Sequence, residues 1–174
     1  MKSKTMQDLI RPVLVLTVIC LIAAALLGGV NSITAPIITE NARIKAESTR
    51  KEVLPGASAF TEIDCDLEAL DLTGAFKENS GLGYVFTSSH KGYGGPVVVT
   101  VGLSPEGKII GLSVDVSTET TGIGSKAGRA DYVDRFIGLS GDVSQVDSIS
   151  GATYSSNALK AGLKAALAAF EALR

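Results

Sequence analysis

Hydroxyl residues crowd around one glycine just before the last helix-forming segment, in the stretch SISGATYSS at residues 148–156. Such a helix start can bind an anion, because its free backbone N–H groups and the helix dipole both favour negative charge. The same residue types are what any helix prefers at its first positions. Simple N-capping by Thr153, Ser155 or Ser156 is therefore the favoured interpretation of this stretch taken alone.

Two further stretches combine glycine with an apolar or aromatic residue. In STETTGIG, residues 117–124, two glycines flank Ile123 and allow the backbone to approach a flat ligand closely. In GYGGP, residues 92–96, a flexible turn carries one aromatic, Tyr93. An ordinary loop and a hairpin connection are the corresponding structural alternatives.

The side chains of conventional catalysis are scarce in these 174 residues, which contain one histidine, two cysteines and no tryptophan. These counts exclude a multi-histidine metal site, a haem with two histidine ligands and an iron–sulfur cluster. The formal charge of −2 argues against a nucleic-acid-binding protein. The acidic stretch 61–71 lacks the spacing of an EF-hand and indicates a solvated turn. We expect no catalytic side chain and no metal site.

The elements that must position these stretches are mainly strands, followed by one strong helix. Segments 84–88, 97–103 and 108–116 predict strands, and Ser-Pro-Glu-Gly at 104–107 fits a type I turn between the last two. A short helix is predicted over 129–139, and an amphipathic helix over 155–173. The pattern predicts an α+β fold with an antiparallel sheet and packed helices.

An uncharged run covers residues 12–39 and begins with a dense apolar part, residues 12–30. As a helix this dense part would be about 28 Å long, close to the thickness of a bilayer's hydrocarbon core. It exceeds the usual apolar region of a signal peptide and has no clean cleavage site after it. We therefore favour an uncleaved transmembrane helix over residues 12–34, in contact with membrane lipid, rather than a signal peptide.

The positions of the cations predict an orientation for this span. Lys2, Lys4 and Arg11 precede it closely, whereas the next cations lie well after it. The positive-inside rule then places residues 1–11 in the cytoplasm and the remainder of the chain outside. A connecting helical region is expected over residues 35–82, with a charged helix at 40–54, and the remaining domain over 83–174.

Four features, taken in chain order, resemble one family across essentially the whole chain. They are the apolar span, GYGGP with its hairpin, the E-T-x-G-x-G loop and the motif D-x-x-S-G-A-T-x-S-S. This family is the FMN-binding domain of the G-type subunit of Rnf complexes, the ion-translocating ferredoxin:NAD oxidoreductases. The related C-type subunit of the Na⁺-pumping NADH:quinone reductase shares it. The commoner loop sequence is ETPGLG; here Thr121 replaces proline and Ile123 replaces leucine.

The resemblance implies FMN attached covalently, through its phosphate, to the hydroxyl of Thr153 by a flavin transferase. Asp147 matches the aspartate that this transferase recognises in the family. Whether Tyr93 touches the flavin is left open. Apart from Thr153, the cofactor-binding residues implied are Ser150, Gly151, Ala152 and Ser155 in one motif, and Glu119, Thr120, Gly122, Ile123 and Gly124 in the other.

The function implied is electron relay through FMN in a membrane complex that couples ferredoxin and NAD chemistry to Na⁺ or H⁺ translocation. An electron carrier needs no general acid, base or nucleophile, because the cofactor carries the chemistry. The expected partners are the other subunits of that complex and the flavin transferase. Two alternatives are a membrane-anchored FMN protein of another electron-transfer chain and a non-redox single-span adaptor in which S-G-A-T only caps a helix.

Overall fold

A computed structural model describes the backbone of residues 2–173 and the side chains of residues 10–173, and the chain divides into two compact units after Lys45. Helix α1 (Lys2–Val53) forms the first unit, and its final turns belong to the second. In the described residues, α1 is the one helix long and apolar enough to cross a membrane. It includes both the predicted span and the predicted charged helix in a single element.

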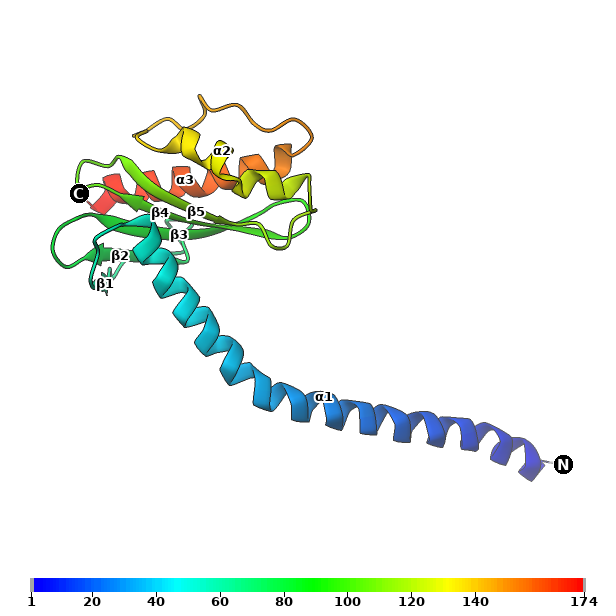
Figure 1. Cartoon of the computed structure of the whole chain (residues 1–174). Helices are drawn as coiled ribbons and strands as arrows, with labels where there is room; N and C mark the ends of the chain where they lie inside the picture. Colours follow the sequence, from blue (N-terminus) through cyan, green and yellow to red (C-terminus); the bar gives the residue numbers. More distant parts are fainter. Residues whose placement is uncertain (1, 174) are drawn as a thin grey trace. The chain divides into compact units, whose positions relative to one another are not determined.

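The second unit contains a five-stranded antiparallel sheet whose strands lie in chain order (Figure 1). Strands β3 and β4 pair over their whole lengths, from Tyr84 opposite Leu103 to Lys91 opposite Pro96. Strand β3 therefore extends beyond the predicted residues 84–88, because the tight turn at 92–95 holds the two strands together. The strands are β1 (Phe60–Glu62), β2 (Gly74–Glu78), β3 (Tyr84–Lys91), β4 (Pro96–Leu103) and β5 (Ile109–Asp115).

One face of the sheet is covered by the C-terminal helix α3 (Thr153–Leu173) (Figure 1). Its apolar stripe, which includes Leu159, Leu163 and Phe170, is buried in the main hydrophobic core. Gly162 permits close packing, since a Cβ at this position would lie 2.9 Å from the Cβ of Val99 in β4. This contact fixes the height of α3 above the strands, and so the position of its first turn.

The opposite face of the sheet receives the end of α1. Val53 and Leu54 are buried against Val85, whose side chain points away from that of its core neighbour Phe86. The Val53 carbonyl lies directly over two glycines, since a Cβ on Gly111 would come within 2.1 Å of its oxygen. A small second core thus anchors the last turn of α1 to the sheet.

Replacing Gly111 with alanine is expected to lower the free energy of unfolding by about 2 kcal/mol, because overpacking against rigid backbone displaces the end of α1. Ser113→Ala, two residues further along β5, is the matched control and should change stability by no more than about 0.5 kcal/mol. Urea titration of the detergent-solubilised chain, read by pulse proteolysis, measures both. Equal stability of the two variants would contradict this close packing.

Two stretches differ from the sequence-based expectation. The predicted helix over 129–139 is divided into a short α2 (Ala130–Val133) and a 3₁₀ turn, η2 (Asp134–Phe136). It stops there because the Gly138 N–H donates to the Ile109 carbonyl and the Ile109 N–H donates to the Leu139 carbonyl. The region 35–82, expected to be a helical connection, contains strands β1 and β2 after α1 ends.

A buried carboxylate organises the turn between β2 and β3. One oxygen of Glu78, Oε2, accepts backbone N–H groups of Ser80 at 2.7 Å and Leu82 at 3.2 Å. Burial alone would raise the pKa of this carboxyl, but the hydrogen bonds outweigh it and the pKa lies below its ordinary value. The charged form is therefore the one that stabilises this turn.

The lowered pKa of Glu78 predicts acid sensitivity. An acid with a depressed folded-state pKa contributes stability that is complete above its unfolded pKa and is lost as pH falls through the folded value. The unfolding free energy should thus decline below about pH 4.5, the ordinary glutamate value. Glu78→Gln should flatten part of that decline, whereas Glu68→Gln, at an exposed position, should leave it unchanged. Superimposable pH profiles for Glu78→Gln and the parent would contradict this role.

Candidate functional site

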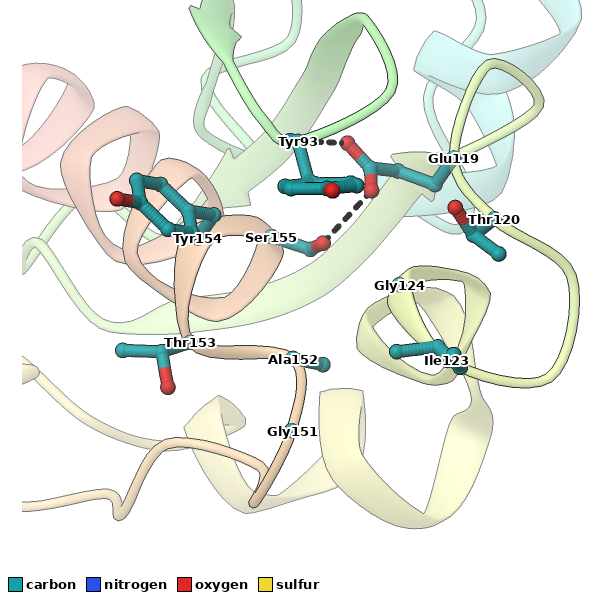
Figure 2. A pocket seen from close by; sticks show the side chains of 10 residues that line it. All are labelled: Tyr93, Glu119, Thr120, Ile123, Gly124, Gly151, Ala152, Thr153, Tyr154 and Ser155. Carbon is teal, nitrogen blue, oxygen red and sulfur yellow. Dashed lines mark hydrogen bonds between the residues drawn. The ribbon is translucent and has the colours of Figure 1, made fainter.

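A cavity of about 490 Å³ opens at the start of α3, where the turn between β3 and β4 meets the loop after β5 (Figure 2). Its size lies within the range of small-molecule and cofactor sites. Three stretches singled out in the sequence, far apart along the chain, meet here. The lining residues are Tyr93, Glu119, Thr120, Ile123, Gly124, Gly151, Ala152, Thr153, Tyr154 and Ser155.

Most of the residues expected to bind a cofactor line this cavity. Two of them do not, Ser150 and Gly122, and neither does Asp147, which was named for recognition by the transferase. Ser150 is exposed in the loop before α3, and Gly122 forms the tip of its own loop, with φ of +79° and its N–H donating to Ser125 Oγ. Gly122 contributes to the shape of its loop, as its positive φ indicates.

Glu119 connects the three stretches. Its side chain is only 6% exposed, and its Oε1 accepts the backbone N–H groups of Tyr93 at 2.9 Å and Gly94 at 3.3 Å. The other oxygen, Oε2, accepts the Ser155 hydroxyl at 2.8 Å (Figure 2). One buried carboxylate thus ties the β3–β4 turn and the first turn of α3 to the loop after β5.

Glycines make room for this carboxylate. A Cβ on Gly92 would come within 2.0 Å of Glu119 Oε1, and one on Gly124 within 2.2 Å of Oε2. Gly124 begins the 3₁₀ helix η1 (Gly124–Gly128), so the loop can turn back under the cavity only without a side chain there. The glycines of both stretches therefore serve the packing of Glu119 as well as an open cavity.

The loop before α3 is shaped by one glycine and one serine. Gly151 adopts φ of +79°, a left-handed conformation in which a side chain would be strained. The buried Ser156 hydroxyl accepts the Ile149 N–H at 3.1 Å and holds the incoming chain against the helix. Thr153 is consequently the first residue of α3 and is exposed at the edge of the cavity.

The start of α3 suits an anionic group such as a phosphate. The first N–H groups of a helix have no partner within it, and they carry the positive end of the helix dipole. Ala152, just before Thr153, is buried, and its N–H donates to the Ile149 carbonyl. The Ser156 hydroxyl thus bonds the loop before α3 rather than a first-turn N–H of the helix, and Thr153 stays exposed.

Asp147 lies beside a second, smaller cavity of about 250 Å³, also lined by Lys126, Arg129, Tyr132 and Arg135. Tyr132 is buried, which raises the pKa of its phenol, and Asp147 adds to that rise. Asp147 itself is exposed, six residues before Thr153 along the same loop. It is accessible to a macromolecule that approaches this loop.

Sequence reasoning missed one aromatic residue and left another open. Tyr154 lines the cavity although no motif pointed to it, and Tyr93 lines it as well. The two rings lie together, with centroids 6.2 Å apart and planes tilted by 48° (Figure 2). In the sequence, Tyr154 could have been noticed as a large aromatic residue at the start of the amphipathic helix that does not belong to its apolar stripe.

The cavity's composition fits FMN. Aromatic and aliphatic side chains from Tyr93, Tyr154 and Ile123 offer apolar contact to a flat ring system. Hydroxyl and backbone groups of Thr120 and the start of α3 offer hydrogen bonds and a site for the phosphate. The described residues contain no His, Cys, Asp and Glu cluster that could hold a metal ion.

Comparison with known proteins gives two family matches that together span much of the chain. Residues 92–168 match the FMN-binding domain family, and residues 1–53 match the RnfG N-terminal region. The first match includes every residue lining the larger cavity.

Curated relatives match over most of their lengths. The G-type subunit of an ion-translocating oxidoreductase complex from Stutzerimonas stutzeri is 32% identical, over 86% of this chain and 75% of the relative. The G-type subunit of a proton-translocating ferredoxin:NAD(+) oxidoreductase complex from Clostridium ljungdahlii is 26% identical, over 87% of this chain and 86% of the relative. Its counterpart in a Na(+)-translocating ferredoxin:NAD(+) oxidoreductase complex from Acetobacterium woodii is 29% identical, over 92% of this chain and 90% of the relative.

These matches agree with the cavity, its loops and the apolar N-terminal helix, and they confirm the resemblance found in the sequence. The chain carries an FMN-binding domain behind a helix able to cross a membrane. It belongs to the RnfG family, the G-type subunits of the Rnf-type ion-translocating oxidoreductase complexes.

Proposed function

We propose that this chain relays electrons through an FMN bound covalently to Thr153. It does so within a membrane complex that transfers electrons between ferredoxin and NAD and couples this transfer to translocation of Na⁺ or H⁺. Bound FMN supplies the electron-transfer chemistry, and the protein supplies binding, orientation and electrostatics. Two relatives are named for different ions, protons in one and Na⁺ in the other, so the proposal includes both.

The observation that carries the proposal is the exposed position of Thr153 at the edge of the cavity and at the first residue of α3. A flavin transferase needs access to the hydroxyl that it modifies, and a phosphate left there gains from the helix N-terminus. The flat ring can then enter the cavity beside Ile123 and Glu119. Covalent attachment keeps the flavin on a domain that lies where FMN is not resupplied.

We propose the following arrangement at the membrane. Residues 1–11 lie in the cytoplasm, residues 12–34 span the bilayer in contact with lipid, and the FMN-binding domain over 83–174 lies on the extracytoplasmic side, joined by residues 35–82. The support for this sidedness is the cluster of cations before the span. The other subunits of the complex are the expected partners of the domain.

The test is a denaturing gel of the full chain purified from cells with and without a co-expressed flavin transferase. We expect yellow-green flavin fluorescence in the protein band only with the transferase, because a phosphoester survives denaturation whereas non-covalent FMN dissociates. A chain that co-purifies with flavin but loses all of it on denaturation would contradict the covalent link. A chain without flavin under either condition would contradict the electron-carrier function.

A further inference from the structure

We propose that Tyr93 and Tyr154 form an aromatic wall that contacts the flavin ring, and that Glu119 is the positioning residue that holds both tyrosines in place. This inference rests on the proposed function and adds to it. It assigns a binding role to Tyr154, which no motif indicates, and a single physical role to the buried carboxylate.

The aromatic wall is defined by the two tyrosine rings, which lie in contact at the cavity. Tyr93 is 75% exposed and Tyr154 is 69% exposed, so neither ring is buried in the core. Their centroids are 6.2 Å apart, within the range of favourable aromatic pairs. Ile123, 51% exposed, lies across the cavity from both rings (Figure 2). Apolar surface thus borders the cavity on two sides.

These three side chains border one cavity, and exposed apolar surface grouped around a cavity is typical of a binding site. A flat aromatic ligand would cover all three side chains at once. The isoalloxazine ring has the required shape, and aromatic rings favour offset or edge contacts with such a ring system. Hydrogen-bonding groups at the edge of the cavity then serve the polar part of the same ligand.

Glu119 sets the relative position of the two tyrosines through their backbones. Its Oε1 accepts the N–H of Tyr93 itself, at 2.9 Å. Its Oε2 accepts the hydroxyl of Ser155, the residue directly after Tyr154, at 2.8 Å. Tyr93 lies in the turn between β3 and β4, and Tyr154 lies 61 residues later in α3, so no local contact along the chain holds them together. The carboxylate supplies that link.

The test uses the quenching of flavin fluorescence by tyrosine. An excited oxidised flavin in contact with a phenol takes an electron from it and returns it without emission, whereas a phenylalanine ring stacks similarly but is not oxidised. We therefore compare Tyr93→Phe and Tyr154→Phe with the parent, measuring the native flavin fluorescence lifetime of the full chain after flavinylation. Tyr84→Phe is the matched control, because Tyr84 lies in β3 against Phe170 and does not line the cavity.

We expect a strongly quenched flavin in the parent and in Tyr84→Phe, and a lifetime several-fold longer in Tyr93→Phe, Tyr154→Phe or both. Glu119→Ala should also lengthen the lifetime, because it removes the acceptor of both the Tyr93 N–H and the Ser155 hydroxyl. Lifetimes in all variants equal to that of the parent would overturn the proposal. Flavin content is measured separately on a denaturing gel, so loss of attachment is not mistaken for loss of the wall.

A second measurement tests the wall independently of covalent attachment. Free FMN is titrated onto unmodified Thr153→Val protein, and the quenching of the bound fraction is compared between this background and the same background with Tyr93→Phe and Tyr154→Phe combined. Quenching that the phenylalanines relieve supports the wall even if Thr153 is not the attachment site. FMN that binds with equal emission in both, or that does not bind, would overturn it.

Discussion

Thr153→Val should abolish denaturation-resistant flavin in this protein. Valine matches threonine in shape and branching but lacks the hydroxyl oxygen that would carry the phosphate. Because Thr153 is exposed at the first residue of α3, the substitution should cost the fold little, within about 0.5 kcal/mol. In-gel fluorescence after co-expression with a flavin transferase measures the result, and the expected signal is at background.

Two control variants test whether a loss of covalent flavin is specific to the Thr153 hydroxyl. Thr153→Ser keeps a hydroxyl at the same backbone position and should retain covalent flavin. Ser150→Ala removes a hydroxyl from an exposed position in the same loop, outside the cavity, and should also retain it. Undiminished fluorescence in Thr153→Val would show that the flavin is attached elsewhere. Loss in all three variants would point to disruption of the loop rather than removal of the attachment atom.

The second large effect is expected from Glu119→Ala. This substitution leaves the N–H groups of Tyr93 and Gly94 and the hydroxyl of Ser155 without their acceptor. A hydrogen bond to a charged group contributes about 1.5–3 kcal/mol, and buried groups left unsatisfied add a further cost. Since the three bonds share one carboxylate and do not add fully, we expect the unfolding free energy to fall by about 3 kcal/mol.

Urea titration of the detergent-solubilised chain, followed by pulse proteolysis, measures this loss. Glu68→Ala is the control, because Glu68 is exposed, and its effect should stay within about 0.5 kcal/mol. Glu119→Gln should fall between the two, since its amide oxygen can still accept from the turn at Tyr93 and Gly94. Equal stability of Glu119→Ala and Glu68→Ala would contradict the central place given to this carboxylate.

Strands β3, β4 and β5 and the last helix could be predicted from the sequence because their signals are local. The alternating pattern in 108–116 and the apolar stripe in 155–173 depend on neighbouring residues, and the structure places β5 and α3 there. Helix α3 begins two residues earlier than predicted, at Thr153, because Ser156 holds the preceding loop through Ile149. That bond depends on the loop geometry, which periodicity does not show.

Non-local contacts explain what could not be predicted. Strand β2 has little alternation of its own and is stabilised by pairing with β3 on one side and β1 on the other. The early end of α2 results from the pairing of Gly138 and Leu139 with Ile109 in β5. Both depend on contacts between segments far apart in the chain.

The candidate site shows the same division. The glycine and hydroxyl motifs could be found in the sequence, and most of their residues line one cavity. Glu119 was expected to border the cofactor, but its three hydrogen bonds depend on a fold that brings Tyr93 and Ser155 to it. Tyr154 was missed because its place in the site depends on its contact with Tyr93, which is far away in the sequence.

Peptide mapping by mass spectrometry of the full chain, co-expressed with a flavin transferase, tests most directly whether Thr153 carries the cofactor. We expect the intact chain to gain the mass of one FMN less one water, and fragmentation to locate that addition on Thr153. An unmodified Thr153 with the added mass on another hydroxyl residue, such as Ser150 or Ser155, would contradict the assignment. An intact mass without any addition, from cells in which the transferase flavinylates another known substrate, would contradict covalent flavin altogether.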